Sequence, residues 1–453
     1  MDQDLGWWVR VALDGWRHRR GPRYRRIAAT LAEAAARRVV RPGDRLPPER
    51  LLADALAVSR GTVVRAYQEL AEQQLVERRQ GSGTYLRRPP VPPPSTAPQP
   101  PAPDVDLIDL SLPVPGSAAH LPAVGALPAL DGYGHGVHPA GLPELREALA
   151  EHLSSWLRLP TAPEQLIVTA GSGQALALLG AALPTPGRPL LTGCPGRPGL
   201  ADLLPGHPAV GLPLGPQGQL DLAAVDRAAR RAPAPVLLLD GAAHQVPPTR
   251  HAELLALPRR HGAVLVEDLS QPTAGRTPLA ALDPGAVALG SLSATFWAGL
   301  RIGWLRAEPE LLERVLALRQ DLAPAVPGQL LAVELLRAAD PGWHRHQERT
   351  RADQRALLEG ALAEQLPGWR VHPVPVGLAL RVQLPVTDAT TFAHLAATRF
   401  GVRTTAGAAA CLDGRHLAEL RLGYARSPGT LRAAVDRLRA AWQEHTRQLA
   451  ASP

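Results

Sequence analysis

The stretch that decides the fold of the N-terminal part, residues 41–70, reads RPGDRLPPERLLADALAVSRGTVVRAYQEL. Within it, Pro47 and Pro48 precede a short predicted helix over residues 49–57. We expect this helix to bury Leu51, Leu52, Ala55 and Leu56. A tight turn follows, and Ser59 is well placed to cap the next helix, because its side-chain oxygen can accept a free backbone N–H.

The second predicted helix carries an apolar stripe on one face and basic or hydroxyl side chains on the other. Its apolar positions recur at spacings of three and four residues: Val63, Ala66, Tyr67 and Leu70. Its opposite face offers Arg60, Thr62 and Arg65. An earlier helix is expected over residues 23–38, with Ile27, Leu31 and Ala34 as its apolar positions. Two helices joined by a short turn, the second with a basic start, indicate a helix-turn-helix that meets base edges in the major groove.

A hairpin is predicted directly after these helices. Residues 75–77 and 84–86 have the character of short strands, and residues 78–83 between them read RRQGSG. The glycines permit positive φ at the tip, and the arginines can contact phosphates. We interpret the hairpin as the wing of a winged helix.

Positive charge is concentrated in the same part of the chain. The sequence contains no lysine, so all 49 basic residues are arginines. Residues 1–88 hold 18 of them against 10 acidic residues, which accounts for the net charge of +8, while residues 89–453 hold 31 of each sign. A small module with such an excess favours a nucleic-acid partner, because each neutralised phosphate releases counterions.

Residues 22–87 resemble the winged-helix domain of GntR-family regulators. The match lies in Arg41-Pro-Gly-Asp-Arg-Leu-Pro-Pro-Glu-Arg50, Val58-Ser-Arg60, Thr62-Val63 and Gly81-Ser-Gly-Thr84. The resemblance implies a DNA-binding domain with double-stranded DNA as partner, and we place its limits at residues 15 and 88. It also implies that five residues lie against DNA: Arg50, Ser59, Arg60, Thr62 and Gly81.

A proline-rich stretch separates this domain from the rest. Nine of the fifteen residues from Pro89 to Pro103 are proline, so we predict an extended linker over residues 89–106. From residue 107 to 453, short β-rich runs at residues 166–169, 236–239 and 263–266 alternate with helical stretches rich in Ala and Leu. This alternation predicts an α/β domain with a mainly parallel sheet covered by helices.

Several short motifs follow one another in this second part. The segment Thr169-Ala-Gly-Ser-Gly-Gln174 lies between a strand and a helix, where free backbone N–H groups can hold a phosphate. Asp268 ends an apolar strand, Ser291-Leu-Ser293-Ala294 begins a run that reaches Arg301, and Arg421 lies near the C-terminus. As an ordered set they resemble the fold-type-I aminotransferase fold, with a smaller C-terminal α+β subdomain. Joined to a GntR winged helix, they resemble the MocR-type transcriptional regulators.

The resemblance assigns roles in a pyridoxal phosphate site. Ser172, Ser291, Ser293 and Arg301 would hold the cofactor phosphate. Asp268 would pair with the pyridine nitrogen. Arg421 would grip an amino-acid carboxylate in a bidentate fork, which lysine cannot reproduce.

The departures from the family pattern are as informative as the matches. The position of the lysine that forms the Schiff base with pyridoxal phosphate holds Ala294, and the chain has no other lysine. Where the family has an aromatic residue that stacks on the cofactor ring, this sequence has Arg197. It has Ser270 in place of the family tyrosine two residues after Asp268, and Thr249 in place of the usual glycine. A methyl group is not a nucleophile. We therefore predict no catalytic residue and no covalently bound pyridoxal phosphate.

Three interpretations of the cavity remain open. It binds pyridoxal phosphate non-covalently, or it binds another small anionic or amino-acid effector through Arg301, Arg421 and Arg197, or it binds nothing and the fold serves dimerisation. The predicted function is a sequence-specific transcriptional regulator, a homodimer in the bacterial cytoplasm and nucleoid. The alternatives are an aminotransferase with a DNA-binding head and an interaction scaffold. With two cysteines and no apolar run that could span a membrane, we expect no metal site and no membrane partner.

Overall fold

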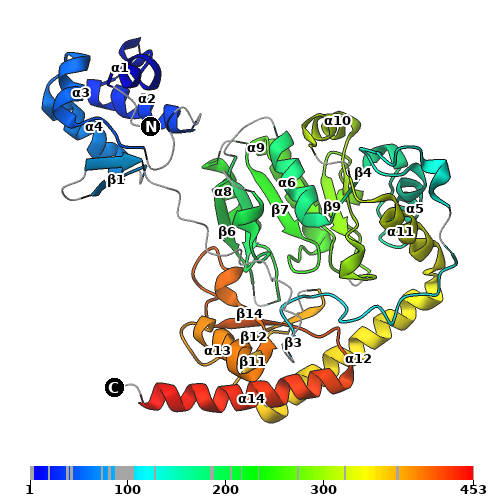
Figure 1. Ribbon diagram of the computed structural model, residues 1–453. Coiled ribbons are helices and arrows are strands. Elements are labelled where there is room, and N and C mark those ends of the chain that lie inside the picture. The colour runs from blue at the N-terminus through cyan, green and yellow to red at the C-terminus, as the bar shows by residue number, and fades with distance from the viewer. Residues whose placement is uncertain are drawn as a thin grey trace. The chain divides into compact units, whose positions relative to one another are not determined.

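A computed structural model describes residues 5–18, 21–36, 40, 44–72, 75–79, 83–86, 107–126, 129–183, 188–204, 207–215, 217–232, 234–272, 275–320, 323–373 and 377–451. The chain forms two compact units, residues 1–94 and residues 95–453 (Figure 1). The predicted linker over residues 89–106 lies outside the described residues, and so does Gly81.

The first unit consists of short helices followed by a two-stranded hairpin. Its elements are α1 (Leu5–Trp7), the π-helix η1 (Trp8–Ala12), the 3-10 helix η2 (Trp16–His18), α2 (Arg23–Ala36), α3 (Glu49–Leu56), α4 (Arg60–Glu72), β1 (Val76–Arg79) and β2 (Gly83–Leu86). The core positions predicted for α2 and α4 are buried. Trp8 and Trp16 join the same core, packed with Ile27, so residues ahead of the winged helix belong to its hydrophobic cluster.

One face of α3 differs from the sequence prediction. Leu52 and Leu56 are buried as expected, but Leu51 is 50% exposed and Ala55 also faces solvent. The third buried position is Ala53. A helix of two turns that packs on one side of α4 can bury only one stripe, and residues 52, 53 and 56 form that stripe. Ala57 then ends the helix in the left-handed conformation, with φ of 55°.

The second unit is built on a large sheet. Within the described residues its strands are, in spatial order, β4 (Leu166–Thr169), β10 (Gly303–Arg306), β9 (Val287–Ser291), β8 (Val264–Asp268), β7 (Val236–Asp240), β5 (Leu190–Cys194) and β6 (Ala209–Pro213). Pairs from β9 to β6 run parallel, and β10 runs antiparallel to both of its neighbours. The observed fold is therefore the mainly parallel α/β sheet that the sequence predicted.

Helices cover both faces of this sheet. Side chains alternate between the two faces along each strand, and here both faces are apolar, so each must be buried under helices. On β7, Leu237 and Leu239 enter one hydrophobic cluster, while Val236 and Leu238 enter another. The first cluster includes residues of α5 (Pro143–Ser155), α8 (Leu222–Arg230), α9 (His251–His261) and α11 (Val326–Ala338). The second includes residues of α6 (Ser172–Ala182), α7 (Leu200–Leu203) and α10 (Pro309–Leu318).

A smaller subdomain completes the unit. Its antiparallel sheet has the order β11 (Arg370–Val371), β12 (Ala379–Gln383), β15 (Glu419–Gly423) and β14 (Thr405–Ala406), and β3 (Ile108–Asp109) pairs with β13 (Val402–Arg403). It also contains α13 (Thr390–Phe400). Figure 1 shows the two longest helices, α12 (Pro341–Gln365) and α14 (Pro428–Ala451), lying against this subdomain. Among the described helices, none is both long and apolar enough to cross a membrane.

Candidate functional site

The start of α4 has the geometry that the sequence predicted for a recognition helix. Ser59 precedes the helix, and its Oγ accepts a hydrogen bond from the backbone N–H of Thr62 at 3.2 Å. The hydroxyls of Ser59 and Thr62 are also 2.8 Å apart. Both hydroxyls thus belong to a capped, ordered helix end, which fixes the direction in which α4 begins.

Basic side chains surround this helix end. Arg50 and Arg60 are exposed, and the Arg60 guanidinium lies 3.7 Å from Glu49, a solvent-facing ion pair that contributes little to stability. Arg65, one turn further along, instead lies over the ring of Tyr24, with its guanidinium carbon 4.4 Å from the ring centroid. Arg60 is therefore the more available of the two α4 arginines for an external partner.

The hairpin is antiparallel, with Val76 opposite Leu86 and Arg79 opposite Gly83. The sequence placed Arg79 in the tip, whereas it ends β1. A third segment, which the sequence did not reveal, runs along β2. The N–H of Leu46 donates to the Thr84 carbonyl at 2.8 Å, and the backbones of Arg45 and Tyr85 form an isolated antiparallel β-bridge. The wing is thus attached to the segment that leads into α3.

A cavity of about 370 Å³ lies where the large sheet meets the small subdomain. Strand ends supply much of its wall, which is where ligands bind in open α/β sheets. All the residues that the resemblance assigned to the pyridoxal phosphate site line it: Ser172, Asp268, Ser291, Ser293, Ala294, Arg301 and Arg421. The fold therefore brings these residues together, although their roles remain predictions.

One end of the cavity is formed by the start of α6. Gly171 precedes this helix with φ of 115°, a conformation that favours glycine, and Ser172 is its first residue. Gly303 on β10 lies directly against the backbone of Gly171, since a Cβ at position 303 would stand 2.5 Å from the Gly171 Cα. The close approach of two glycines thus positions a helix N-terminus whose free N–H groups favour an anion.

The turn after β9 supplies the remaining groups at this end. Ser291 Oγ donates to Ser293 Oγ at 2.8 Å and accepts from the Ser293 N–H at 3.2 Å. Arg301 is exposed and has a left-handed backbone, with φ of 54°. Among the described residues its guanidinium has no ion-pair partner. Strained residues of this kind tend to be kept where a site requires them.

Next to this end, where the ring of pyridoxal phosphate would lie (the ring end), the cavity contains an ion pair. Arg197 Nη1 lies 2.8 Å from Asp268 Oδ2 and 3.0 Å from Ser172 Oγ. The second oxygen of Asp268 accepts hydrogen bonds from the backbone N–H and the hydroxyl of Ser270. Sequence reasoning noted Arg197 and Ser270 as departures from the family but missed that both bind Asp268. Two departures from the family pattern, 73 positions apart, thus form one hydrogen-bonded group with Asp268.

Arg421 and Ala294 also line the cavity, Arg421 from β15 of the small subdomain and Ala294 from the turn after β9. Arg421 lies on β15 beside Arg381 of β12, and burial lowers the pKa of its guanidinium, an effect that the carboxylate of Asp240 opposes. Ala294 is 1% exposed, and its methyl group packs in the hydrophobic cluster of the small subdomain. Arg351 donates to the Ala294 carbonyl at 3.0 Å. The position is thus integrated into a packed core.

Comparison with known proteins now becomes informative. Residues 23–86 match the bacterial regulatory proteins of the gntR family, and residues 130–438 match the aminotransferase class I and II family. The chain belongs to the aminotransferase class I and II family and carries a gntR-family domain in its N-terminal part. The gntR-type winged helix is a DNA-binding domain, and relatives of the larger domain bind pyridoxal phosphate.

Two regulators share this domain order along most of their length. The HTH-type pyridoxine biosynthesis transcriptional regulator PdxR of Corynebacterium glutamicum is 29% identical over 387 residues, which is 78% of this chain and 81% of that protein. The uncharacterized HTH-type transcriptional regulator YdcR of Escherichia coli is 26% identical over 80% of this chain and 86% of that protein. Among solved structures, an archaeal alanine:glyoxylate aminotransferase superposes with a TM-score of 0.65 at 25% identity, over 75% of this chain and 92% of that one.

Proposed function

We propose that the chain is a sequence-specific transcriptional regulator whose aminotransferase-like domain has lost catalysis and binds a small anionic effector. The observation that carries this proposal is the Arg197–Asp268 ion pair, which lies 2.8 Å apart at the ring end of the cavity. Arg197 engages the Asp268 carboxylate, which would otherwise keep a pyridine ring protonated. Together with Ala294 in a lysine-free chain, it leaves the site without the two groups on which pyridoxal phosphate chemistry depends.

The residues present fit pyridoxal phosphate at one end only. Ser172, Ser291 and Arg301 offer hydroxyl, helix-terminal and guanidinium donors suited to a phosphate. At the other end both oxygens of Asp268 already have partners within the protein, Ser270 and Arg197. A pyridinium ring would have to displace Arg197 to reach them. We therefore derive no reaction through this cofactor.

The charges in the cavity favour an anionic ligand. Its walls contain three arginines, Arg197, Arg301 and Arg421, against two aspartates, Asp240 and Asp268. Because Arg197 and Asp268 neutralise each other, Arg301 and Arg421 face a single remaining carboxylate. A volume of about 370 Å³ lies within the range of small-molecule sites. A ligand with two acidic groups, one near Arg301 and one near Arg421, satisfies this arrangement best.

Regulation requires the effector to bind two arrangements of the protein with different affinities. We propose that the larger unit forms a homodimer in the cytoplasm, so that two winged helices read paired half-sites on double-stranded DNA. The operator should then contain repeated or palindromic elements. DNA contacts would be made by Arg50, Ser59, Arg60 and Thr62 at the helix starts, and by Gly81 of the wing.

The experiment that tests this function measures retardation of the chain's own promoter DNA, with a scrambled fragment as competitor. Arg60→Ala should weaken specific binding by about 10- to 100-fold, the discrimination carried by one good base contact. Arg25→Ala is the matched control, because it removes the same charge from α2 beside Glu69, 3.8 Å away at the far end of α4. Equal binding to both fragments, or equal losses in both variants, would contradict the proposal.

A further inference from the structure

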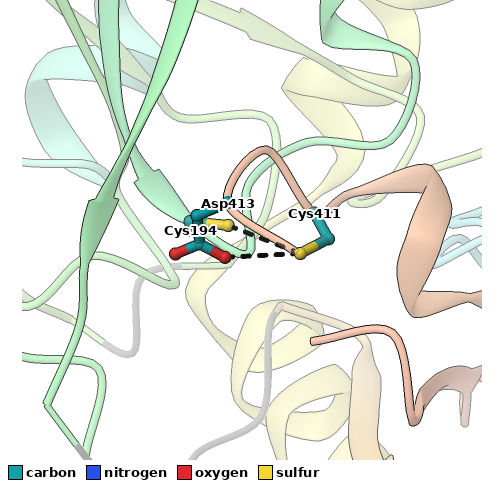
Figure 2. A group of neighbouring side chains, drawn as sticks. All are labelled: Cys194, Cys411 and Asp413. Atoms are coloured by element: carbon teal, nitrogen blue, oxygen red, sulfur yellow. Dashed lines mark hydrogen bonds between the residues drawn. The ribbon is translucent and has the colours of Figure 1, made fainter. Parts of the chain in front are cut away.

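The only two cysteines of the chain lie side by side, although 217 residues separate them. Cys194 is the last residue of β5, and Cys411 follows the 3-10 helix η8 (Gly407–Ala409). Their Sγ atoms are 4.0 Å apart, and the Cys411 Sγ lies 3.4 Å from Asp413 Oδ1 (Figure 2). All three of these ligand atoms lie within 4.8 Å of one another.

These separations suit a shared cation better than a covalent bond between the sulfurs. In a tetrahedral zinc site with Zn–S bonds of about 2.3 Å, two sulfurs stand roughly 3.8 Å apart, and a sulfur and an oxygen about 3.6 Å apart. A disulfide requires about 2.05 Å. The observed 4.0 and 3.4 Å are therefore close to two edges of such a tetrahedron.

Neighbouring groups prepare all three ligand atoms. The N–H of Leu412 donates to Cys194 Sγ at 3.2 Å, and the N–H of His416 donates to Cys411 Sγ at 3.3 Å. Each sulfur therefore has a fixed backbone donor that orients it within the cluster. Arg415 Nε donates to Asp413 Oδ2 at 2.7 Å, and the backbone N–H of Arg415 donates to Oδ1 at 3.0 Å, so both carboxylate oxygens are held in place. This is the kind of outer support that orients metal ligands.

The backbone holds the two halves of the cluster together. Gly211 on β6 lets the loop approach β5, since a Cβ there would lie 3.0 Å from both the Cys194 Cβ and the Leu412 Cβ. The N–H of Gly196 also donates to the Ala410 carbonyl at 2.9 Å. Cys194 is fully buried, whereas Cys411 and Asp413 are partly exposed, so an ion can enter from the loop side.

We propose that Cys194, Cys411 and Asp413 form a binding site for a thiophilic divalent cation of the zinc class, with water as the fourth ligand. The bound ion ties the end of β5 to the small subdomain. Residue 197, which lies three positions after Cys194, carries the guanidinium that holds Asp268 in the cavity. The site therefore braces the loop that shapes the ring end of the cavity.

The test titrates the reduced full-length protein with Co²⁺ and records its absorption spectrum. We expect one equivalent to produce thiolate-to-cobalt charge-transfer bands and the d–d bands of a tetrahedral ion, and Zn²⁺ to abolish both. Zn²⁺ should also raise the thermal midpoint. Histidines elsewhere in the chain give no sulfur charge-transfer band, so the signal reports this site alone.

Variants identify the ligands. Cys411→Ser should remove the charge-transfer bands, and Asp413→Asn should weaken Co²⁺ binding by at least 10-fold. Asp388→Asn is the matched control, because Asp388 Oδ1 accepts the backbone N–H of Thr390 at 2.7 Å, as Asp413 Oδ1 accepts that of Arg415, but Asp388 is not part of the cysteine cluster. Absence of sulfur bands in the reduced protein would overturn the proposal. So would unchanged binding in Asp413→Asn, or ready air oxidation to a disulfide with no affinity for Co²⁺ or Zn²⁺.

Discussion

The two units of this regulator have kept different amounts of their families' machinery. The start of α4 retains the capping serine and exposed arginine that its family pattern requires, with Ser59 bonded to Thr62 at 3.2 Å. In the cavity, the start of α6 and the turn after β9 offer donors suited to an anion, but at the ring end Arg197 holds Asp268, and Ala294 lies in a packed core. The difference teaches that recognition and catalysis are separable: an anion can be bound by donors alone, whereas Schiff-base chemistry requires an amine.

The largest expected effect concerns an attempt to restore the cofactor site. Ala294→Lys should give at most a trace of aldimine absorbance with pyridoxal phosphate, because Arg197 still occupies Asp268 and the new side chain enters a hydrophobic cluster. Adding Arg197→Tyr should increase the aldimine at least 10-fold by freeing the carboxylate. A full aldimine band in the single variant would show that Arg197 does not block the ring end.

The next effect concerns Glu267, the neighbour of Asp268 on β8. Burial raises the pKa of its carboxyl to about 7, because the charged form loses hydration. Since this folded-state pKa lies above the unfolded value, its protonated form stabilises the fold at low pH, and that contribution is lost as pH rises through about 7.

We therefore expect Glu267→Gln to gain stability relative to the native chain between about pH 4.5 and 7, by up to about 3 kcal/mol in urea unfolding. Glu313→Gln, on an exposed face of α10, is the control for loss of a carboxylate. A difference between Glu267→Gln and the native chain that does not change with pH would mean that the carboxyl is charged in the folded protein.

A smaller effect tests the end of the cavity that has been kept. Arg301→Ala should weaken binding of pyridoxal phosphate or inorganic phosphate by about 10-fold in calorimetry, which corresponds to about 1.4 kcal/mol. Arg314→Ala removes an exposed arginine of α10 and should leave this affinity unchanged. If Arg301→Ala and Arg314→Ala bind the phosphate compound equally well, the anion does not contact Arg301. The proposed anion-binding role of that end of the cavity would then be wrong.

The smallest effect concerns the DNA-binding unit. Ser59→Ala removes the side-chain acceptor at the start of α4 and should cost about 1 kcal/mol of unfolding free energy in chemical denaturation. Ser59→Asp, which restores a capping oxygen, should recover that stability. Equal unfolding free energies for the native chain, Ser59→Ala and Ser59→Asp would show that this hydrogen bond does not contribute to stability.

Sequence reasoning reached the fold and most of the cavity because both follow from local patterns. Alternating apolar runs identified β4, β7 and β8, and the Ser172, Asp268 and Ser291 motifs lie at strand or helix ends that meet in one cavity. It was wrong about Leu51 and Ala55, because apolar character alone does not show which side of a short helix faces its neighbour.

Long-range pairing was not accessible in the same way. Arg197 and Asp268 are 71 residues apart, and no local pattern announces that a guanidinium will bind that carboxylate. The cysteine pair presents the same difficulty over 217 residues. Both contacts arise only when parallel strands bring their carboxyl ends to one edge of the sheet or against the small subdomain.

The central claim, that the aminotransferase-like unit has no covalent cofactor chemistry, is tested most directly by borohydride trapping. The native full-length protein is incubated with pyridoxal phosphate and an amino acid, reduced, digested and mapped by mass spectrometry, with keto-acid formation measured in parallel. We predict no phosphopyridoxyl group on any internal residue and no keto acid, since the α-amino terminus is the only primary amine of the unmodified chain. A stoichiometric internal adduct, or sustained transamination, would contradict the account.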